Sequence, residues 1–467
     1  MKMWSGRVSQ PLDEHFEQWQ RSFGYDRRLL VFECAASTVY ADALVGAGVL
    51  TQSEAARIKT ALHDLVNRCS TNPLAFEDSD AEDVHHFVEL ELVGALGDVG
   101  RKLHTGRSRN EQIATDLRLY VRGAIRDVRT SLAELGTALL GQARLLQGAP
   151  MPAYTHMQRA EPIVAAHWLL AYVEMFLRDA ERLTDCAKRV NLLPLGSGAI
   201  AGCTIPIDRE QVARDLGFAG ITQNSMDATS DRDFEVEYLN ALSLIALHLS
   251  RMAEDFCLYS TVEFGFVKLP DQFATGSSAM PQKKNPDSME LLRGKTARVL
   301  AAAQTLMVTL KGLPMAYNRD LQESQEPLFA AADAVQDSLH VATGFLAKVE
   351  FDTARMRQAA SGGYLNATAA ANYLVRKGVP FRSAHEIIGK AVRRALDKGC
   401  ELEALPAADL AQFSDKFGPD FAESVALARV LAAHDVEGGT APARVAEALK
   451  AAEQRISALS EEVHAHA

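Results

Sequence analysis

Proline is distributed unevenly along the 467-residue chain, and this distribution constrains the fold more than any other feature of the sequence. Because proline inside a helix removes a backbone hydrogen bond and clashes with the preceding turn, a long proline-free segment is free to form one continuous helix. Five such segments, each also poor in glycine, cover residues 112–149, 163–193, 227–269, 287–313 and 328–361. The pattern predicts five long helices.

Hydrophobic spacing supports this interpretation. The first segment keeps apolar side chains three and four residues apart, which predicts an amphipathic helix, at Leu117, Tyr120, Val121, Ala124, Val128, Leu132, Leu135 and Leu139. The third segment also has apolar residues off its main face, namely Leu244, Leu247 and Leu258. A helix of about 30 residues is about 45 Å long, and one subunit of this size cannot easily cover it on every side. We therefore expect oligomerisation through these helices.

The ends of the chain differ from its middle. Before residue 110 and after the Gly362–Gly363 pair, shorter elements alternate with turn residues. The predicted fold is all-α, with a long central helical bundle flanked by two smaller, mostly helical domains. The predicted boundaries are an N-terminal domain over 1–110, a bundle and oligomerisation domain over 111–361, and a C-terminal domain over 362–467.

Composition narrows the functional classes. A net charge of −11 disfavours a nucleic-acid partner but allows a local basic pocket for a small anion. No stretch approaches the ~18 uncharged apolar residues of a membrane helix, and the N-terminus lacks the apolar region of a signal peptide. Neither a disulfide framework nor a zinc site is indicated, because no short spacing joins Cys34, Cys69, Cys186, Cys203, Cys257 and Cys400. We expect a cytoplasmic protein that is not bound to membranes.

The stretch TGSSAMPQKKNPDSME, residues 275–290, is unusual in a chain rich in Ala and Leu. It is not a nucleotide P-loop, because no second glycine precedes a lysine at the required spacing. Asn285 and Pro286 suit a helix start, but a helix start needs neither Gly276 with two serines nor the lysine pair at 283–284. These residues indicate a mobile loop that closes over an anion. A serine there can abstract a proton only if a cation such as Lys283 and oriented donors stabilise its alkoxide.

Two further loops flank the first predicted helix. In KLHTGRSRNEQ, residues 102–112, Ser108 and Glu111 fit a capping box, and two arginines add positive charge at a helix start that favours anions. A capped helix with solvated arginines is the other interpretation. In MPAYTHMQRAEP, residues 151–162, His156 suits an acid or base, with Thr155 beside it; a merely exposed histidine is the alternative.

Together, these loops resemble the fumarase/aspartase superfamily. Its signature G-S-S-x-M-P-x-K-x-N matches Gly276 to Asn285 at every fixed position. Five further segments resemble the argininosuccinate lyases of this superfamily: KLHTGRSRN, YTHMQRAEP, LPLGSGAIAG, NSMDATSDRDF and YNRDLQE. The similarity runs from MWSGR to KGVPFRSAHEIIG. The resemblance implies a homotetramer with active sites shared between subunits, acting on a small-molecule substrate without a cofactor or metal. It also implies reversible elimination of argininosuccinate to arginine and fumarate, a step of arginine biosynthesis and of the urea cycle.

The resemblance further implies roles for single residues. Ser277 is the expected general base, Lys283 and Asn285 stabilise the dianion, and His156 paired with Glu290 assists the leaving arginine. Which proton Ser277 and His156 each handle stays open. Substrate contacts are implied at Ser37, Arg109, Asn110, Thr155, Tyr317 and Gln322.

Departures from the family pattern keep a second hypothesis open. Residues 33–40 read ECAASTVY where the family has Asp-Ile-x-Gly-Ser-x-Ala-His, so only Ser37 matches cleanly. Gln325 stands where the family usually has a substrate-contacting lysine, whereas Glu111 for Asp keeps the charge. A sister lyase that releases fumarate from another N-substituted aspartate is therefore the alternative; fumarase or aspartase proper fits less well. A non-enzymatic lens-crystallin role is disfavoured by the intact catalytic set.

A metal enzyme is a third class of function. The segment EDVHHFVELE, residues 82–91, places Glu82, His86 and Glu89 on one face of a helix, with His85 partly diverging. The resemblance places this segment near the active site without a metal.

Overall fold

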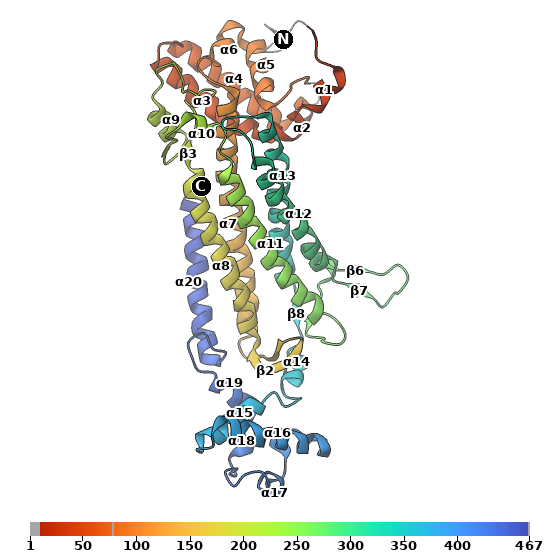
Figure 1. Ribbon diagram of the computed structural model, residues 1–467. Coiled ribbons are helices and arrows are strands. Elements are labelled where there is room, and N and C mark those ends of the chain that lie inside the picture. Colours follow the sequence, from red (N-terminus) through yellow and green to blue (C-terminus); the bar gives the residue numbers. More distant parts are fainter. Residues whose placement is uncertain (1–9, 77–78, 466–467) are drawn as a thin grey trace. The chain divides into compact units, whose positions relative to one another are not determined.

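The computed structural model describes residues 10–76 and 79–465, and the MWSGR segment at residues 3–7 lies outside them. The fold is all-α, as predicted, and its strands are short and pair two by two. Figure 1 shows the long helices that dominate the chain.

The five predicted long helices all form. They are α7 (Arg109–Leu145), α8 (Ala165–Val190), α11 (Asp233–Tyr259), α12 (Asp287–Leu310) and α13 (Gln325–Leu346). In α7 the predicted apolar face is buried, including Leu117, Val121 and Leu135. The last helix begins earlier than predicted, because Pro327 lies in its first turn, where a missing N–H costs no hydrogen bond. It ends at Leu346, and residues 350–351 form a strand instead.

The chain divides into two compact units, and each long helix contributes one part to each. Unit 1 comprises residues 1–127, 182–243 and 298–334, and unit 2 comprises residues 128–181, 244–297 and 335–467. The three-domain boundaries expected from sequence are a different partition and stay a prediction.

Unit 1 packs short helices around α3. Its elements besides the long helices are α1 (Glu14–Trp19), α2 (Phe23–Asp26), α3 (Leu30–Gly46), α4 (Gln52–Thr71), α5 (Val84–Leu96), α6 (Asp98–Lys102), α9 (Arg209–Asp215), α10 (Ser225–Ala228), and the parallel pair β3 (Leu192–Leu193) and β4 (Gly220–Ile221). Tyr40 and Leu44 of α3, Ile58 of α4 and Val84 of α5 are fully buried. The helix α4 starts with a complete capping box between Thr51 and Glu54.

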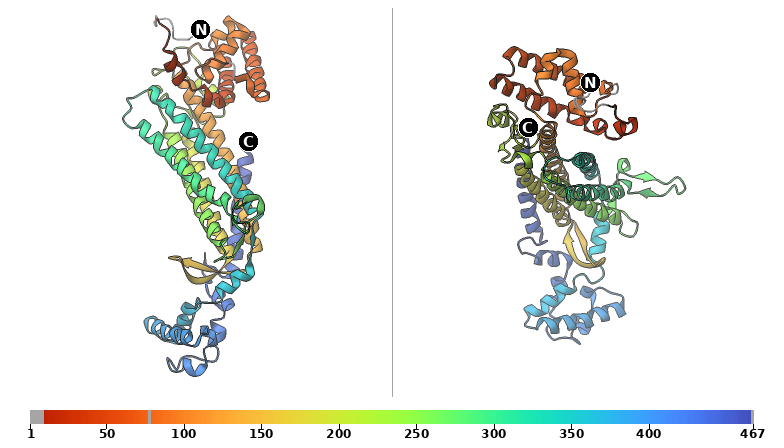
Figure 2. Two further views of the ribbon diagram at one scale, coloured as in Figure 1. Left: turned by 90° about the vertical axis from the view of Figure 1, so that its right-hand side faces the viewer. Right: turned by 45° about the horizontal axis from the view of Figure 1, so that its top comes forward.

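Unit 2 carries three antiparallel strand pairs: β1 (Pro150–Thr155) with β2 (Gln158–Val164), β5 (Val267–Lys268) with β8 (Glu350–Phe351), and β6 (Thr275–Gly276) with β7 (Lys284–Asn285). Its shorter helices are α14 (Thr353–Ala360), α15 (Ala367–Arg376), α16 (Phe381–Lys398), α17 (Ala407–Leu410), α18 (Phe421–Ser424) and α19 (Leu427–Ala433). Helices α15 to α18 gather around one apolar cluster that includes Leu374, Ile388 and Phe421 (Figure 2).

The C-terminal helix α20 (Pro442–Ala465) lies along α7 and α8 within unit 2. Arg144 of α7 binds Glu453 at 2.7 Å, and Arg455 binds Glu174 of α8 at 2.8 Å. Gly136 permits the close approach, because a Cβ there would lie 2.4 Å from the Ile456 side chain. The last helix therefore packs on the long helices rather than within the cluster formed by α15 to α18.

One helical segment, Glu14–Gly46, is long and apolar enough by composition to cross a membrane. Its apolar part is α3, which is packed in the core of unit 1 and carries Glu33 and Asp42.

Candidate active site

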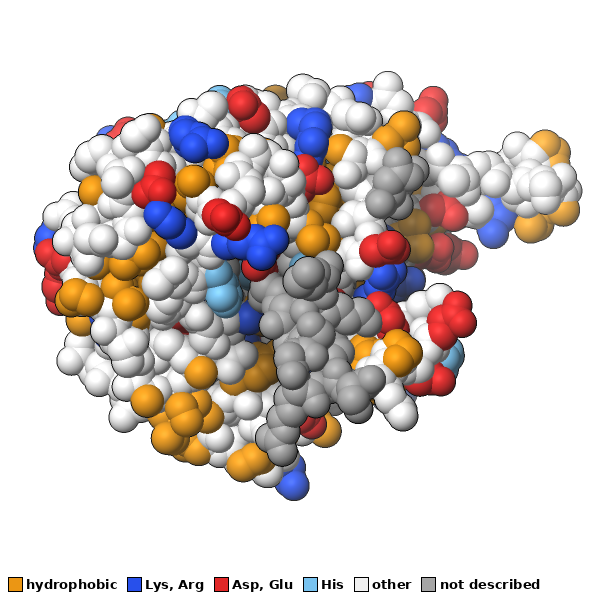
Figure 3. All heavy atoms as spheres, turned by 90° about the horizontal axis from the view of Figure 1, so that it is seen from above, with side chains coloured by type: hydrophobic (Ala, Val, Ile, Leu, Met, Phe, Trp, Pro, Cys, Tyr) orange, Lys and Arg blue, Asp and Glu red, His pale blue; other side chains and the backbone are white. Residues whose placement is uncertain are grey.

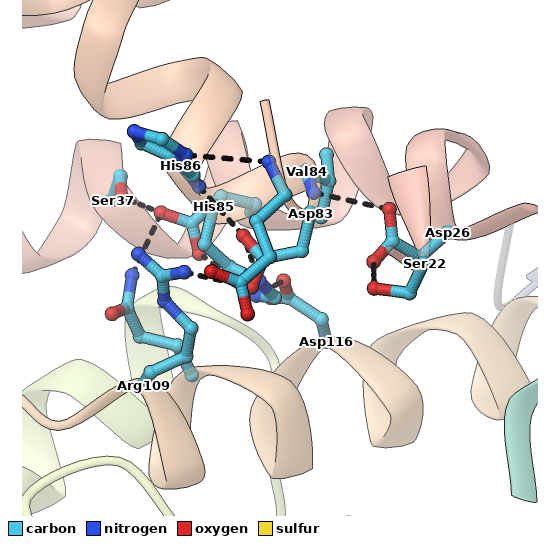
Figure 4. A network of polar contacts seen from close by, with 12 residues as sticks. Ser22, Asp26, Ser37, Asp83, Val84, His85, His86, Arg109 and Asp116 are labelled. Atoms are coloured by element: carbon cyan, nitrogen blue, oxygen red, sulfur yellow. Dashed lines mark hydrogen bonds and ion pairs between the residues drawn. The ribbon is translucent and has the colours of Figure 1, made fainter. Parts of the chain in front are cut away.

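The starts of α5 and α7 are joined in unit 1 by one carboxylate (Figure 4). Asp83 precedes α5 and accepts the His86 amide at 2.7 Å, which caps the helix. It also accepts Arg109 Nη1 at 2.7 Å. Although burial opposes ionisation, the charges of Arg109 and His85 hold the pKa of Asp83 below its usual value. The carboxylate therefore fixes Arg109, a predicted substrate contact.

His85 lies buried among carboxylates. Its Nε2 is 3.0 Å from Asp116 Oδ2 and 3.9 Å from Glu33 Oε2, and its Nδ1 is 3.8 Å from Asp83 Oδ1. Burial disfavours the imidazolium, but the Asp116 hydrogen bond and the three negative charges outweigh it and raise the pKa of His85 to about 9. His85 is therefore the cation that balances this acidic cluster at neutral pH.

Ser37 is linked to the same cluster and is fully buried. Its hydroxyl donates to Glu33 Oε1 at 2.6 Å and accepts Arg107 Nη1 at 2.9 Å. Gln112 Nε2 donates to the same Glu33 oxygen at 3.1 Å. Ser37 lies inside this network, so its predicted contact with substrate stays a prediction.

The two loop arginines are not solvated, so that interpretation is wrong. The Arg107 side chain is only 3% exposed, lies 3.7 Å from Glu33 Oε1, and its guanidinium stacks 4.8 Å from the Tyr40 ring. Arg109 is paired with Asp83. One half of the predicted capping box forms, because Glu111 Oε1 accepts the Ser108 amide at 3.0 Å, while Ser108 Oγ accepts the Asn110 amide at 3.3 Å.

Three more predicted substrate contacts lie in unit 1. The Asn110 amide donates to Ser108 Oγ at 3.3 Å in the first turn of α7. Burial raises the pKa of Tyr317, while the positive charges of Arg232 and Arg319 lower it. Gln322 Nε2 donates to the Gln20 carbonyl at 3.1 Å.

His156 and Thr155 lie in unit 2, where a β-hairpin forms instead of the expected loop. His156 and Met157 are the two turn residues, with φ of 54° and 58°. Positive φ at both central residues is typical of the type I′ turn that matches the twist of a hairpin, and histidine adopts it more readily than most residues do. Thr155 and His156 are exposed at the tip.

The signature loop connects β6 and β7 and projects from the start of α12 (Figures 1 and 2). Ser277 Oγ accepts the amides of Ala279 at 3.3 Å and Met280 at 3.1 Å. Lys283 and Lys284 are both exposed, and Lys284 donates to the Leu269 carbonyl at 2.5 Å. Asn285 lies in β7, and α12 begins at Asp287, so Asn285 is not the residue next to the first helical turn.

Glu290 is exposed in the first turn of α12 and lies 3.8 Å from Arg293. Arg293 also binds Glu254. Within residues 10–76 and 79–465 of this chain, no hydrogen bond or ion pair joins Glu290 to His156. Their pairing stays a prediction, and it requires another arrangement or another subunit.

The side chains of residues 82–91 are arranged differently from what the metal hypothesis expects. His86 Nδ1 accepts the Glu82 amide at 3.3 Å, while His85 turns toward Glu33 and Asp116, whose ligand atoms lie within 4.8 Å of one another. The His85–Asp116 hydrogen bond and the neighbouring Arg107 already neutralise these carboxylates. The arrangement is that of an imidazolium held between acids.

The sequence predicted no role for Glu33 or Asp116, and it predicted only a helix-capping contact for Glu111. A signal was present for Asp116 and Glu111, because charged residues within the apolar start of a long helix are rarely buried without a partner. All residues from Glu111 to Leu119 are buried.

Replacing His85 by glutamine is expected to destabilise the protein by about 3–5 kcal/mol at pH 6.5, because it leaves buried carboxylates without their cation. A histidine whose folded pKa is raised from 6.5 to about 9 contributes stability that is fully present below pH 6.5 and is lost as the pH rises through 9. Urea unfolding at fixed protein concentration should therefore show that the difference in unfolding free energy between wild type and variant becomes smaller from pH 6.5 to 9.

The matched control is His86→Gln. Burial and Arg109 lower the pKa of His86, so this variant should show no such narrowing. A stability gap for His85→Gln that stays constant over this pH range would contradict the imidazolium assignment.

Comparisons with known proteins agree with these features. A family model described as Lyase matches residues 6–301, and one described as Argininosuccinate lyase C-terminal matches residues 364–432. The chain is 55% identical to an argininosuccinate lyase of Koribacter versatilis over 467 residues, covering all of both chains. It is 54% identical to an argininosuccinate lyase of Acidobacterium capsulatum over 460 residues, covering 97% and 95% of the two chains.

Solved structures share the fold. An EDDS lyase in complex with formate matches with a TM-score of 0.85 at 25% identity, covering 94% of this chain and 88% of that one. The 3-carboxy-cis,cis-muconate lactonizing enzyme of Pseudomonas putida matches with a TM-score of 0.76 at 22% identity, covering 95% and 100%. On the full-length identity and both family matches, the chain belongs to the argininosuccinate lyases, C–N lyases of the fumarase/aspartase superfamily.

Proposed function

We propose that this chain catalyses the reversible elimination of argininosuccinate to L-arginine and fumarate, with Ser277 as the base. The observation that carries the proposal is the surroundings of the Ser277 hydroxyl, which accepts two loop amides at 3.3 and 3.1 Å within a full signature match. Hydrogen bonds to an oxygen stabilise its anion, and a nearby cation does so further. A serine supported in this way can remove a proton next to a carboxylate.

Removal of that proton turns the neighbouring carboxylate into a dianion through a carbanion intermediate. Such charge accumulates only where donors and cations already stand. Lys283 and Asn285 flank the loop and would supply them, because Lys283 is exposed and its ammonium is free to turn toward a ligand. Closure of the loop would bring both to the substrate.

The leaving arginine needs a proton as the C–N bond breaks. His156 stands at an exposed hairpin tip beside Thr155, and an imidazole can both donate and accept a proton. Glu290 would orient it by accepting a hydrogen bond from a ring N–H. Ser37, Arg109, Asn110, Thr155, Tyr317 and Gln322 would contact the substrate in the assembled tetramer.

The surface of the long helices supports a homotetramer. Large apolar side chains on α11 and α12 stay exposed in one chain, which is unusual unless a partner covers them: Leu247, Leu291, Leu300, Met307 and Val308. Leu247 is one of the apolar residues that lie off the main face of α11, and a neighbouring subunit would cover it.

The setting of the reaction is the cytoplasm, and the protein binds no nucleic acid or membrane in this proposal. On the face drawn in Figure 3, basic and acidic side chains are interspersed, so this face presents no continuous positive field to a polyanion. The product identifies the pathway as arginine biosynthesis.

Fumarate release, followed by ultraviolet absorbance, tests the substrate. Argininosuccinate, adenylosuccinate, aspartate and malate are supplied separately, and rapid release is expected from argininosuccinate alone. The surroundings of Gln325 favour the second candidate, a sister lyase with another substrate. Gln325 is 2% exposed, and its Oε1 has no hydrogen-bond partner among the described residues. Release from another N-substituted aspartate instead would move the assignment to a sister lyase.

A further inference from the structure

The glycine-rich loop LPLGSGAIAG, residues 193–202, wraps around a carboxylate of its own chain in unit 1. The amides of Gly196 and Gly198 donate to Glu111 Oε2 at 2.6 and 2.9 Å. Both glycines have positive φ, of 96° and 61°. Two amides of one loop thus converge on an anion, and Glu111 Oε2 lies between them.

Side chains cannot replace these glycines without moving the loop. A Cβ at Gly196 would lie 2.6 Å from Arg209 Cδ, and a Cβ at Gly198 would lie 3.0 Å from the Gly202 carbonyl oxygen. Arg209 in turn donates from its Nε to the Leu195 carbonyl at 2.9 Å. Arg209 therefore supports the loop at the Leu195 carbonyl, and Glu111 holds the amides of Gly196 and Gly198.

The other oxygen of Glu111 faces the arginine loop. Glu111 Oε1 accepts the Ser108 amide at 3.0 Å, and the side chain is fully buried. Three N–H donors thus converge on one carboxylate, and each donor needs an acceptor. An ionised carboxylate offers acceptors on both oxygens, whereas an amide side chain offers only one.

This carboxylate ties two segments that lie 85 to 87 residues apart in sequence. One is the rigid glycine loop, and the other is residues 107–110, which carry Arg109 and Asn110. Asp83 holds Arg109 from the α5 side at 2.7 Å. Glu111 is then the contact that sets where the backbone of residues 107–110 lies.

We propose that Glu111 is a positioning residue, whose carboxylate fixes the substrate-binding segment 107–110 against the glycine loop 193–202. This inference rests on the proposed function for its effect on catalysis. Glu111 itself touches neither substrate nor the reacting atoms.

The test compares Glu111→Gln and Glu111→Asp with a matched control, Glu54→Gln. Glu54 makes the same type of contact at the start of α4, accepting the Thr51 amide at 2.9 Å, without a glycine loop. Glutamine at 111 leaves at least one of the three amides without an acceptor, whereas aspartate, the residue that the family has here, keeps the charge on a side chain that is one methylene shorter. A displacement of about 1 Å at a positioning site can cost on the order of 100-fold.

We expect Glu111→Gln to lower kcat/KM for argininosuccinate by about 10- to 100-fold, mainly through KM, because the segment it releases binds substrate. Glu111→Asp should recover part of this loss. Amide hydrogen exchange in residues 193–202 should accelerate in Glu111→Gln but not in Glu54→Gln. A general loss of stability would not produce this difference between the two variants.

The proposal is overturned if folded Glu111→Gln keeps kcat/KM within about twofold of wild type and leaves exchange in the glycine loop unchanged. An equal loss of activity in Glu54→Gln would overturn it as well. If Glu111→Gln does not fold, the kcat/KM and the amide exchange of Glu111→Asp test the proposal instead. A wild type that releases no fumarate from argininosuccinate would contradict the proposed function, while the exchange measurement would still test the tie between the two loops.

Discussion

Ser277→Ala is expected to lower the turnover of argininosuccinate by about 10³-fold, near the middle of the range for losing a general base. The substitution removes the only atom of this side chain that can take the proton. It leaves the amides of Ala279 and Met280 in place, since these belong to the backbone of the loop. Because the serine acts in the proton-transfer step, kcat should fall while KM changes little.

Steady-state kinetics and the mass of the assembly in solution check this result together. The matched control is Ser278→Ala, which changes the neighbouring, exposed serine of the same loop and should keep turnover within about twofold. Near-normal turnover in Ser277→Ala would remove Ser277 from the role of base. A large loss in Ser278→Ala instead would assign that role to the other serine.

The long helices could be predicted because proline spacing and helical periodicity are local properties. The apolar face of α7 is buried as its spacing predicts, through Leu117, Val121 and Leu135. The hairpin β1–β2 was missed because its prolines favour a loop by the same reasoning. Pro150 and Pro152 are tolerated there because a two-stranded ribbon consists of edge strands, whose outward N–H groups need no partner.

The candidate site was predictable only as far as its motifs are contiguous. Ser277, His156 and Arg109 each lie in a segment with a recognisable pattern. The contacts that hold Arg109 and its loop join distant segments: Asp83 binds Arg109 across 26 positions, and Glu111 binds the Gly196 amide across 85. A spacing rule cannot reveal such pairs, because the tertiary fold alone brings the residues together.

Sites shared between subunits predict recovery of activity in mixed tetramers. The motivation is that Glu290 contacts Arg293 in one chain, while His156 stands exposed at a hairpin tip. If one site takes Ser277 and His156 from different subunits, equal mixing of Ser277→Ala and His156→Ala chains leaves both residues intact in about a quarter of the sites. Activity should therefore rise from almost none to about a quarter of wild type.

The experiment dissociates the two inactive proteins mildly, mixes them and lets them reassociate. One variant carries an affinity tag, so that hybrid tetramers are purified and counted before fumarate release is measured. As a control, Ser277→Ala chains are dissociated and reassociated alone, which shows whether reassociation by itself raises the activity. Hybrids without activity would place Ser277 and His156 of each site on one subunit, and the chain would then have to bring its own hairpin tip to its own signature loop.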